Sequence, residues 1–257
     1  MNKIPALTGW IWIKEGFALF RKHPTQFTMM FTGYLFVMLG IGIIPILGQL
    51  MPLLLAPVFS MLFMQAGEKV DRGQDINFSM LLSGLRSPAF RNVLKLGVLY
   101  LVAAVLVIGA SSLVDGGMFW KAMSGQAELE PGAVQQSGML MTMLIAALLY
   151  LPAAMAFWYA APLIVWQKMG VFKAIFYSFF AVFHSGRAFL VYGAAWIVLG
   201  IMLPSIVSVL IAVLIGRGAI VMILMFTFSI VLTVIMYCSF YSTYVHVFGK
   251  PKVEEAE

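Results

Sequence analysis

Three clusters of basic residues, each followed by a proline or glycine, are the part of this sequence best suited to binding chemistry. Each stands directly before a long apolar run, where the residue ahead of the proline or glycine takes the position that caps a helix. Free N–H groups and partial positive charge at a helix N-terminus, beside cationic side chains, can hold a phosphate. We therefore predict contacts to lipid phosphate for Arg21, Lys22, His23, Arg86, Arg91, His184 and Arg187. The alternative is that these charges only orient the chain and that their side chains snorkel to the membrane surface.

A polar stretch near the C-terminus is a second candidate. Tyr241, Ser242, Thr243 and Tyr244 end the last apolar run. One interpretation is an aromatic and polar belt at the membrane surface. The other is that these four residues line a cavity open to the cytoplasmic side.

Catalytic and metal chemistry is not indicated. All ten Asp and Glu residues lie outside the apolar runs or at their ends, so no paired carboxylates are expected within the membrane. His23, His184 and His246 are far apart in sequence and lack metal-binding spacing, which makes a three-histidine metal site a weak alternative. The single cysteine, Cys238, is expected to pack as a small apolar residue. We predict no enzyme activity, no metal and no cofactor.

The composition requires a membrane environment for these residues. Hydrophobic residues make up 62% of the 257 and charged residues only 10%, with a mean hydropathy of +0.99. Uncharged runs of about 20 residues recur along the chain, and a run of that length can cross a hydrocarbon core as a helix. We predict an all-α polytopic bundle with six spans. Lys14 and Glu15 would interrupt the apolar core of a signal peptide, so no removable signal peptide is predicted. The spans are expected at about 25–44, 49–68, 91–113, 138–166, 188–215 and 219–247.

The distribution of lysine and arginine predicts the orientation of these spans. Fourteen of the sixteen basic residues fall on one side, and only Lys121 and Arg217 fall on the other. The positive-inside rule therefore predicts that both termini lie in the cytoplasm. The net charge of +6 and the pI near 9.5 follow from this topology, and no nucleic-acid motif is present.

Short amphipathic helices are predicted ahead of the first, third and fifth spans. Each is too short to cross the membrane and ends in a basic or polar break. The expected apolar faces are Trp10, Ile13, Phe17 and Phe20 in the first, Phe78, Leu81, Leu82 and Leu85 in the second, and Phe172, Phe176, Phe179 and Phe183 in the third.

This pattern divides the single membrane domain, residues 1–257, into three repeats. Each repeat is a short interfacial helix followed by two spans, at about 9–70, 76–168 and 170–248. Ala56-Pro57 and Ala161-Pro162 recur in the second spans of the first two repeats. Parallel repeats of this kind predict a pseudo-three-fold arrangement about the membrane normal.

With this layout, and most clearly in the stretch "GWIWIKEGFALF" followed by a basic residue and a proline, the chain resembles a family of bacterial inner-membrane proteins with six predicted spans. It is also loosely similar in layout to the membrane domain that accompanies glycerophosphodiester phosphodiesterases. The catalytic barrel of those enzymes is absent from this sequence. The resemblance therefore implies location and architecture, and it brings no assigned reaction or site residues.

The functional prediction is a structural or accessory protein of the inner membrane that interacts with lipid. The alternative is a carrier or scramblase for a lipid or an amphipathic small molecule. An intramembrane enzyme ranks last, and the absence of charged residues within the spans lowers the case for an ion-coupled transporter. The expected partners are membrane lipids, with another membrane protein or a second copy of this chain left open, and no nucleic acid.

Overall fold

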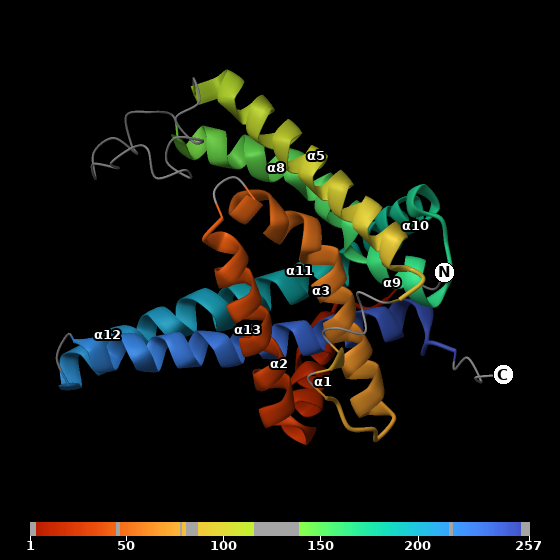
Figure 1. Ribbon diagram of the computed structural model, residues 1–257. Helices are drawn as coiled ribbons and strands as arrows, with labels where there is room; N and C mark the ends of the chain where they lie inside the picture. The colour runs from red at the N-terminus through yellow and green to blue at the C-terminus, as the bar shows by residue number, and fades with distance from the viewer. Residues whose placement is uncertain are drawn as a thin grey trace.

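The computed structural model describes residues 4–44, 47–77, 79–80, 87–115, 139–215 and 218–252, which form helices and connecting turns without any strand (Figure 1). The helices are α1 (Thr8–Lys22), α2 (Pro24–Gly42), α3 (Leu47–Asp71), α5 (Phe90–Asp115), α8 (Met139–Trp158), α9 (Ala160–Trp166), α10 (Val171–His184), α11 (Gly186–Ile197), a π-helical segment η2 (Val198–Met202), α12 (Leu203–Ile215) and α13 (Ala219–Phe248). Within these ranges, six segments are long and apolar enough to cross a membrane. They confirm the predicted all-α bundle of six spans.

The spans form three helical hairpins that share one end, which we call the base. The hairpins are α2 with α3, α5 with α8 and α9, and the α11–α12 segment with α13. Figure 1 shows both termini at the base, while the far ends of the second and third hairpins diverge. At the base, α3 packs against α5 and α9, and α13 packs against α2 and α3.

The hydrophobic core lies in the base half of the hairpins. Phe27 of α2, Phe63 of α3, Leu96 of α5, Leu163 of α9 and Val234 of α13 are all buried there. The far halves instead expose large apolar residues, with Ile43 at 83% and Leu214 at 81% exposure. Such surfaces suit a lipid environment, where burial against protein is not needed to hide apolar side chains from water.

The short helix α1 packs inside the base between α13 and α11, and its buried face overlaps the predicted one only in part. Of the predicted face, Ile13 is buried and Phe17 and Phe20 are partly buried against the core. Trp12, Ile13 and Leu19 are buried, whereas Trp10 is 40% exposed. Two glycines explain the rotation. Gly9 lies against the backbone carbonyl of Ala188, and Gly16 lies against Ser239. Close backbone approach at these glycines sets the contact face, which aromatic periodicity alone did not reveal.

The short helix α10 also turns small residues toward the protein. Ala174, Ser178 and Ala181 are buried against α8 and α9, while Phe172 and Phe183 of the predicted aromatic face are 79% and 64% exposed. The phenylalanine face therefore points away from the protein. The second predicted short helix, carrying Phe78, Leu81, Leu82 and Leu85, falls on residues outside those that the structure describes.

Two prolines explain irregularities in the spans. Pro162 lacks an N–H and its ring crowds the carbonyl four residues earlier, so the fourth span breaks at Tyr159 between α8 and α9. Ser178 of α10 satisfies the freed groups, since its Oγ accepts from the Tyr159 N–H at 2.8 Å and donates to the Met155 carbonyl at 2.9 Å. In the fifth span the helix widens to the π form just before Pro204.

Candidate functional site

We call each predicted cluster of basic residues, with the proline or glycine that follows it, a joint, and the first joint lies where α1 meets α2. His23 separates the two helices, and Pro24 opens α2 as predicted. The His23 side chain makes no capping hydrogen bond, and its Nδ1 lies 3.7 Å from the Asp75 carboxylate. The neighbouring Arg21 and Lys22 are exposed.

The other two joints lie at the starts of α5 and α11. At α5, the Ser87 Oγ accepts a hydrogen bond from the Ala89 N–H at 3.3 Å, and Arg91 is exposed. Arg86 lies outside the described residues. At α11, His184 contacts the Phe180 carbonyl through its Nδ1 at 2.7 Å, and Arg187 is exposed.

The first and third joints are too far apart to act as one site. Gly9 at the start of α1 packs on Ala188, next to Arg187. Arg21 stands at the other end of α1, about 18 Å away at the rise of an α-helix. The first and third joints can therefore offer only separate anion contacts.

The polar end of α13 divides between a pocket and the core. Tyr241 and Ser242 line a pocket between α1, α3 and α13, whereas Thr243 and Tyr244 face α9 and its flanking residues. The Thr243 Oγ1 accepts from Trp158 Nε1 at 3.4 Å, and its carbonyl accepts from the Tyr159 hydroxyl at 3.2 Å. The Tyr244 hydroxyl accepts from Gln167 Nε2 at 3.1 Å. These bonds stabilise the break in the fourth span.

The pocket between α1, α3 and α13 has a volume of about 320 Å³ and a mixed charge. Its charged and ionisable lining residues are Glu15, Lys22, Asp71, His246 and Lys250. His246 lies between two acceptors, with Nδ1 3.2 Å from the Ser242 carbonyl and Nε2 3.6 Å from the Glu15 carboxylate.

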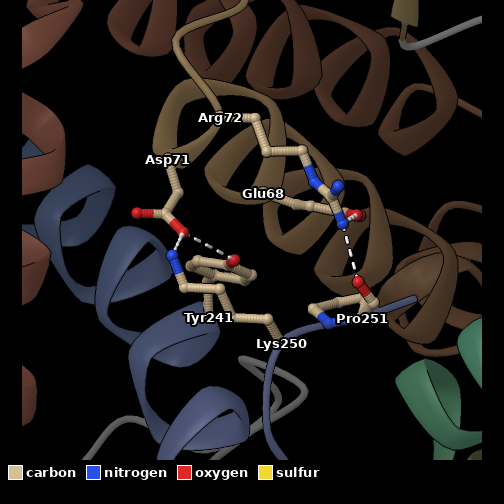
Figure 2. A network of polar contacts seen from close by, with 6 residues as sticks. All are labelled: Glu68, Asp71, Arg72, Tyr241, Lys250 and Pro251. Carbon is tan, nitrogen blue, oxygen red and sulfur yellow. Dashed lines mark hydrogen bonds and ion pairs between the residues drawn. The ribbon is translucent and has the colours of Figure 1, made fainter. Parts of the chain in front are cut away.

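Lys250 brings the C-terminal tail to this pocket, and Figure 2 shows the polar contacts that hold the tail against the end of α3. The Lys250 Nζ lies 2.6 Å from the Asp71 Oδ2, which also accepts from the Tyr241 hydroxyl at 3.2 Å. Arg72 Nη2 donates to the Pro251 carbonyl at 2.7 Å and to Glu68 at 2.8 Å. We call these contacts of Lys250 and Pro251 with Asp71 and Arg72 the C-terminal clasp. Gly249 permits it by turning the chain with φ of 83°.

Each acid that lines this pocket lies near a basic side chain, so the pocket offers little free charge to a ligand. Glu15 is held by His246, and Asp71 is held by Lys250. Within the described part of the chain, no three histidine, cysteine or carboxylate side chains are grouped to hold a metal ion. His23, His184 and His246 each have a different neighbour.

A larger groove of about 990 Å³ runs along α2, with Ile76 and Asn77 on its other side. Thr25, Thr28 and Thr32, at spacings of three and four, form a polar stripe on the groove face of the helix. Gln26 adds a buried Oε1 without a hydrogen-bond partner among the described residues. Met29 and Met30 add apolar side chains between the threonines, and beyond Thr32 the α2 lining is apolar with Phe36 and Val37.

Sequence reasoning missed both the clasp and the threonine stripe. The clasp joins residues about 180 positions apart, and nothing local marks Lys250 or Asp71 as partners. The stripe does carry a signal, because its residues recur at helical spacing in the span whose mean hydropathy, 1.2, is the lowest of the six.

No family model and no solved structure matches the chain. A probable inner membrane protein of Burkholderia thailandensis is 36% identical to it over 252 residues. The match covers 96% of this chain and 93% of that protein. With that identity over nearly the whole of both chains, and with six helices long enough to span a membrane, this protein belongs to the same family of multi-pass bacterial inner-membrane proteins.

Proposed function

We propose that this protein is a non-catalytic, lipid-binding accessory protein of the inner membrane, and that the groove along α2 holds a phospholipid. The observation that carries the proposal is the graded lining of that groove. The hydroxyl and amide side chains of α2 lie in the half of the helix that meets the base, with Met29 and Met30 between them, and the lining beyond Thr32 is apolar. A phospholipid has the same order of polar headgroup and apolar chains.

The length of the threonine stripe fits a lipid headgroup that enters the groove part of the way along α2. From Thr25 to Thr32 the helix rises about 10 Å, so three hydroxyls and the Gln26 amide offer donors and acceptors over that depth. Phe36 and Val37 then provide an apolar surface for acyl chains.

Charge supports an anionic lipid. Arg21 and Lys22 end α1 just before Pro24, which lines the groove; neither is a lining residue of the groove itself, and Lys22 lines the pocket between α1, α3 and α13. We further propose that both termini face the cytoplasm, as the lysine and arginine distribution predicts. Anionic headgroups of the inner leaflet would then lie beside these two side chains.

A carrier or scramblase is the second candidate, and the polar stripe is the feature that favours it. A headgroup that crosses the bilayer needs a polar path through a hydrocarbon core of about 30 Å. The stripe ends at Thr32 and is followed by Phe36 and Val37, so it covers about a third of that path. A polar stripe of this length favours lipid binding over transport of a headgroup across the whole bilayer.

The test fills the groove with a large side chain. Thr32→Trp should reduce the phosphatidylglycerol retained by protein released from nanodiscs, measured by native mass spectrometry. Leu39→Trp is the matched control, since Leu39 is exposed on the same helix and outside the groove lining. Equal retention by wild type and both variants would contradict the proposal. Transfer of labelled lipid between leaflets that depends on Thr32 would favour the carrier instead.

A further inference from the structure

Another groove, of about 430 Å³, runs along α1 and reaches Leu199 of η2. We call it the α1 groove. The residues of α1 that line it are Trp10, Ile13, Lys14, Phe17, Ala18 and Arg21. The described residues that line it are all different from those of the α2 groove, so a ligand in the α1 groove goes beyond the proposed function.

Aromatic and cationic side chains alternate along the α1 groove. Trp10, Lys14, Phe17 and Arg21 follow one another at helical spacings of four, three and four, which places them in one line on the surface of α1. Lys14 and Arg21 are two turns apart on this line, with about 10 Å of helix rise between them. The groove therefore combines an apolar floor with a cation at two points along it.

The two cations of the α1 groove have no acidic partner. Lys14 and Arg21 are exposed, and neither makes an ion pair or a side-chain hydrogen bond with a residue that the structure describes. No Asp or Glu is found among the described residues that line the groove. Glu15 lines the pocket between α1, α3 and α13 instead, where it lies 3.6 Å from His246. Lys22 also lines that pocket, so the structure places Arg21 with Lys14 and apart from its basic neighbour.

The α1 groove joins α1 to a membrane span. Leu199 belongs to the fifth span, and its neighbours Ile197 and Ile201 are 56% and 62% exposed. Apolar side chains that a span exposes in this way are in contact with acyl chains in a bilayer. Trp10, which is 40% exposed, adds an aromatic side chain of the kind that is enriched where headgroups and acyl chains meet. Arg21 ends α1 just before the first span begins, so it lies at a boundary of the apolar region.

We propose that the α1 groove binds an anionic phospholipid, with its headgroup at Lys14 and Arg21 and an acyl chain against Phe17 and Leu199. The guanidinium donates to phosphate oxygens in a fixed fork, and the ammonium adds a point charge. Charge complementarity selects this occupant. A zwitterionic lipid compensates two cations less well, and an apolar helix of a second protein would bury both charges without a partner.

The experiment compares the double variant Lys14→Gln/Arg21→Gln with Lys69→Gln/Lys95→Gln, which removes two exposed cations outside the groove. Native mass spectrometry measures the phosphatidylglycerol and the phosphatidylcholine that each protein retains from nanodiscs. Both double variants are repeated in the Thr32→Trp background, so that lipid in the α2 groove does not mask the result. Lys14→Gln alone is also measured, because Lys14 belongs to the α1 groove and to no joint.

Phosphatidylglycerol retention should fall about tenfold in Lys14→Gln/Arg21→Gln and several-fold in Lys14→Gln, and it should stay unchanged in the control. Phosphatidylcholine retention should be the same in all variants. Wild-type retention of phosphatidylglycerol by Lys14→Gln/Arg21→Gln would overturn the inference, whatever Thr32→Trp does at the α2 groove. An equal loss of both lipids would overturn it too, because charge would then not select the ligand. So would a dimer of the chain that this double variant loses, since a second copy would then occupy the groove.

Discussion

Gly16 of α1 packs so closely on Ser239 of α13 that a Cβ added to the glycine would lie 2.6 Å from the serine Cβ. The same serine hydroxyl lies 2.6 Å from the Tyr192 hydroxyl of α11 and donates to the Met236 carbonyl. One residue of α13 is thus the common contact of α1 and α11, and it fixes the short helix between two spans.

Gly16→Leu should destabilise the base, because the added side chain meets backbone and Cβ atoms of α13 that cannot move independently. Overpacking of this kind costs about 1–3 kcal/mol. The apparent melting temperature in detergent measures the effect. Gly40→Leu is the matched control, since nothing lies within 4 Å of a Cβ added there. Equal melting temperatures for the two variants would show that α1 is not held by this contact.

Ser178→Ala should destabilise the break between α8 and α9. The substitution removes the hydroxyl that bonds both the Tyr159 N–H and the Met155 carbonyl, and the Tyr159 N–H is buried. Leaving such groups unpaired costs about 1–3 kcal/mol. Thermal unfolding in detergent again gives the readout. Ser208→Ala serves for comparison, because the Ser208 hydroxyl bonds only to a carbonyl of its own helix. A loss in Ser208→Ala as large as in Ser178→Ala would contradict the explanation.

Asp71→Asn should loosen the C-terminal clasp with little change in global stability. Lys250 is two-thirds exposed, so its ion pair contributes at most about 1 kcal/mol. Hydrogen exchange of the peptide containing residues 249–252 should nevertheless become several-fold faster, because the tail loses its charged anchor. Asp75→Asn, which changes a carboxylate with 74% exposure elsewhere, should leave that peptide unaffected. Unchanged exchange in Asp71→Asn would show that Arg72 alone holds the tail.

The proposed orientation can be tested with reporters fused to the C-terminus. A green fluorescent protein fusion should fluoresce and an alkaline phosphatase fusion should be inactive, because both termini are expected in the cytoplasm. The reverse pattern would place the C-terminus outside the cytoplasm. It would also move the mouth of the α2 groove to the opposite leaflet.

Sequence reasoning came close to the ends of the spans. The predicted 25–44 and 219–247 differ from the observed Pro24–Gly42 and Ala219–Phe248 by at most two residues. It also placed Pro24 at the start of α2. The structure places the four residues that the sequence suggested as a cavity lining on different faces of α13. Tyr241 and Ser242 line a pocket, but Thr243 and Tyr244 pack in the core, since one helical turn carries neighbouring residues to different faces. The three-repeat division and the lipid-phosphate role of the joints stay predictions.

The sequence by itself determined the class of protein, the spans and the positions where helices start or break. These properties depend on local quantities, namely the hydropathy of a run of about 20 residues and the backbone limits of proline. Only the tertiary structure decided which face of α1 is buried, how the tail fastens to α3, and that α1 and the fifth span share a groove. Those outcomes depend on backbone approach and charge pairing between distant segments, and no local pattern in the chain encodes them.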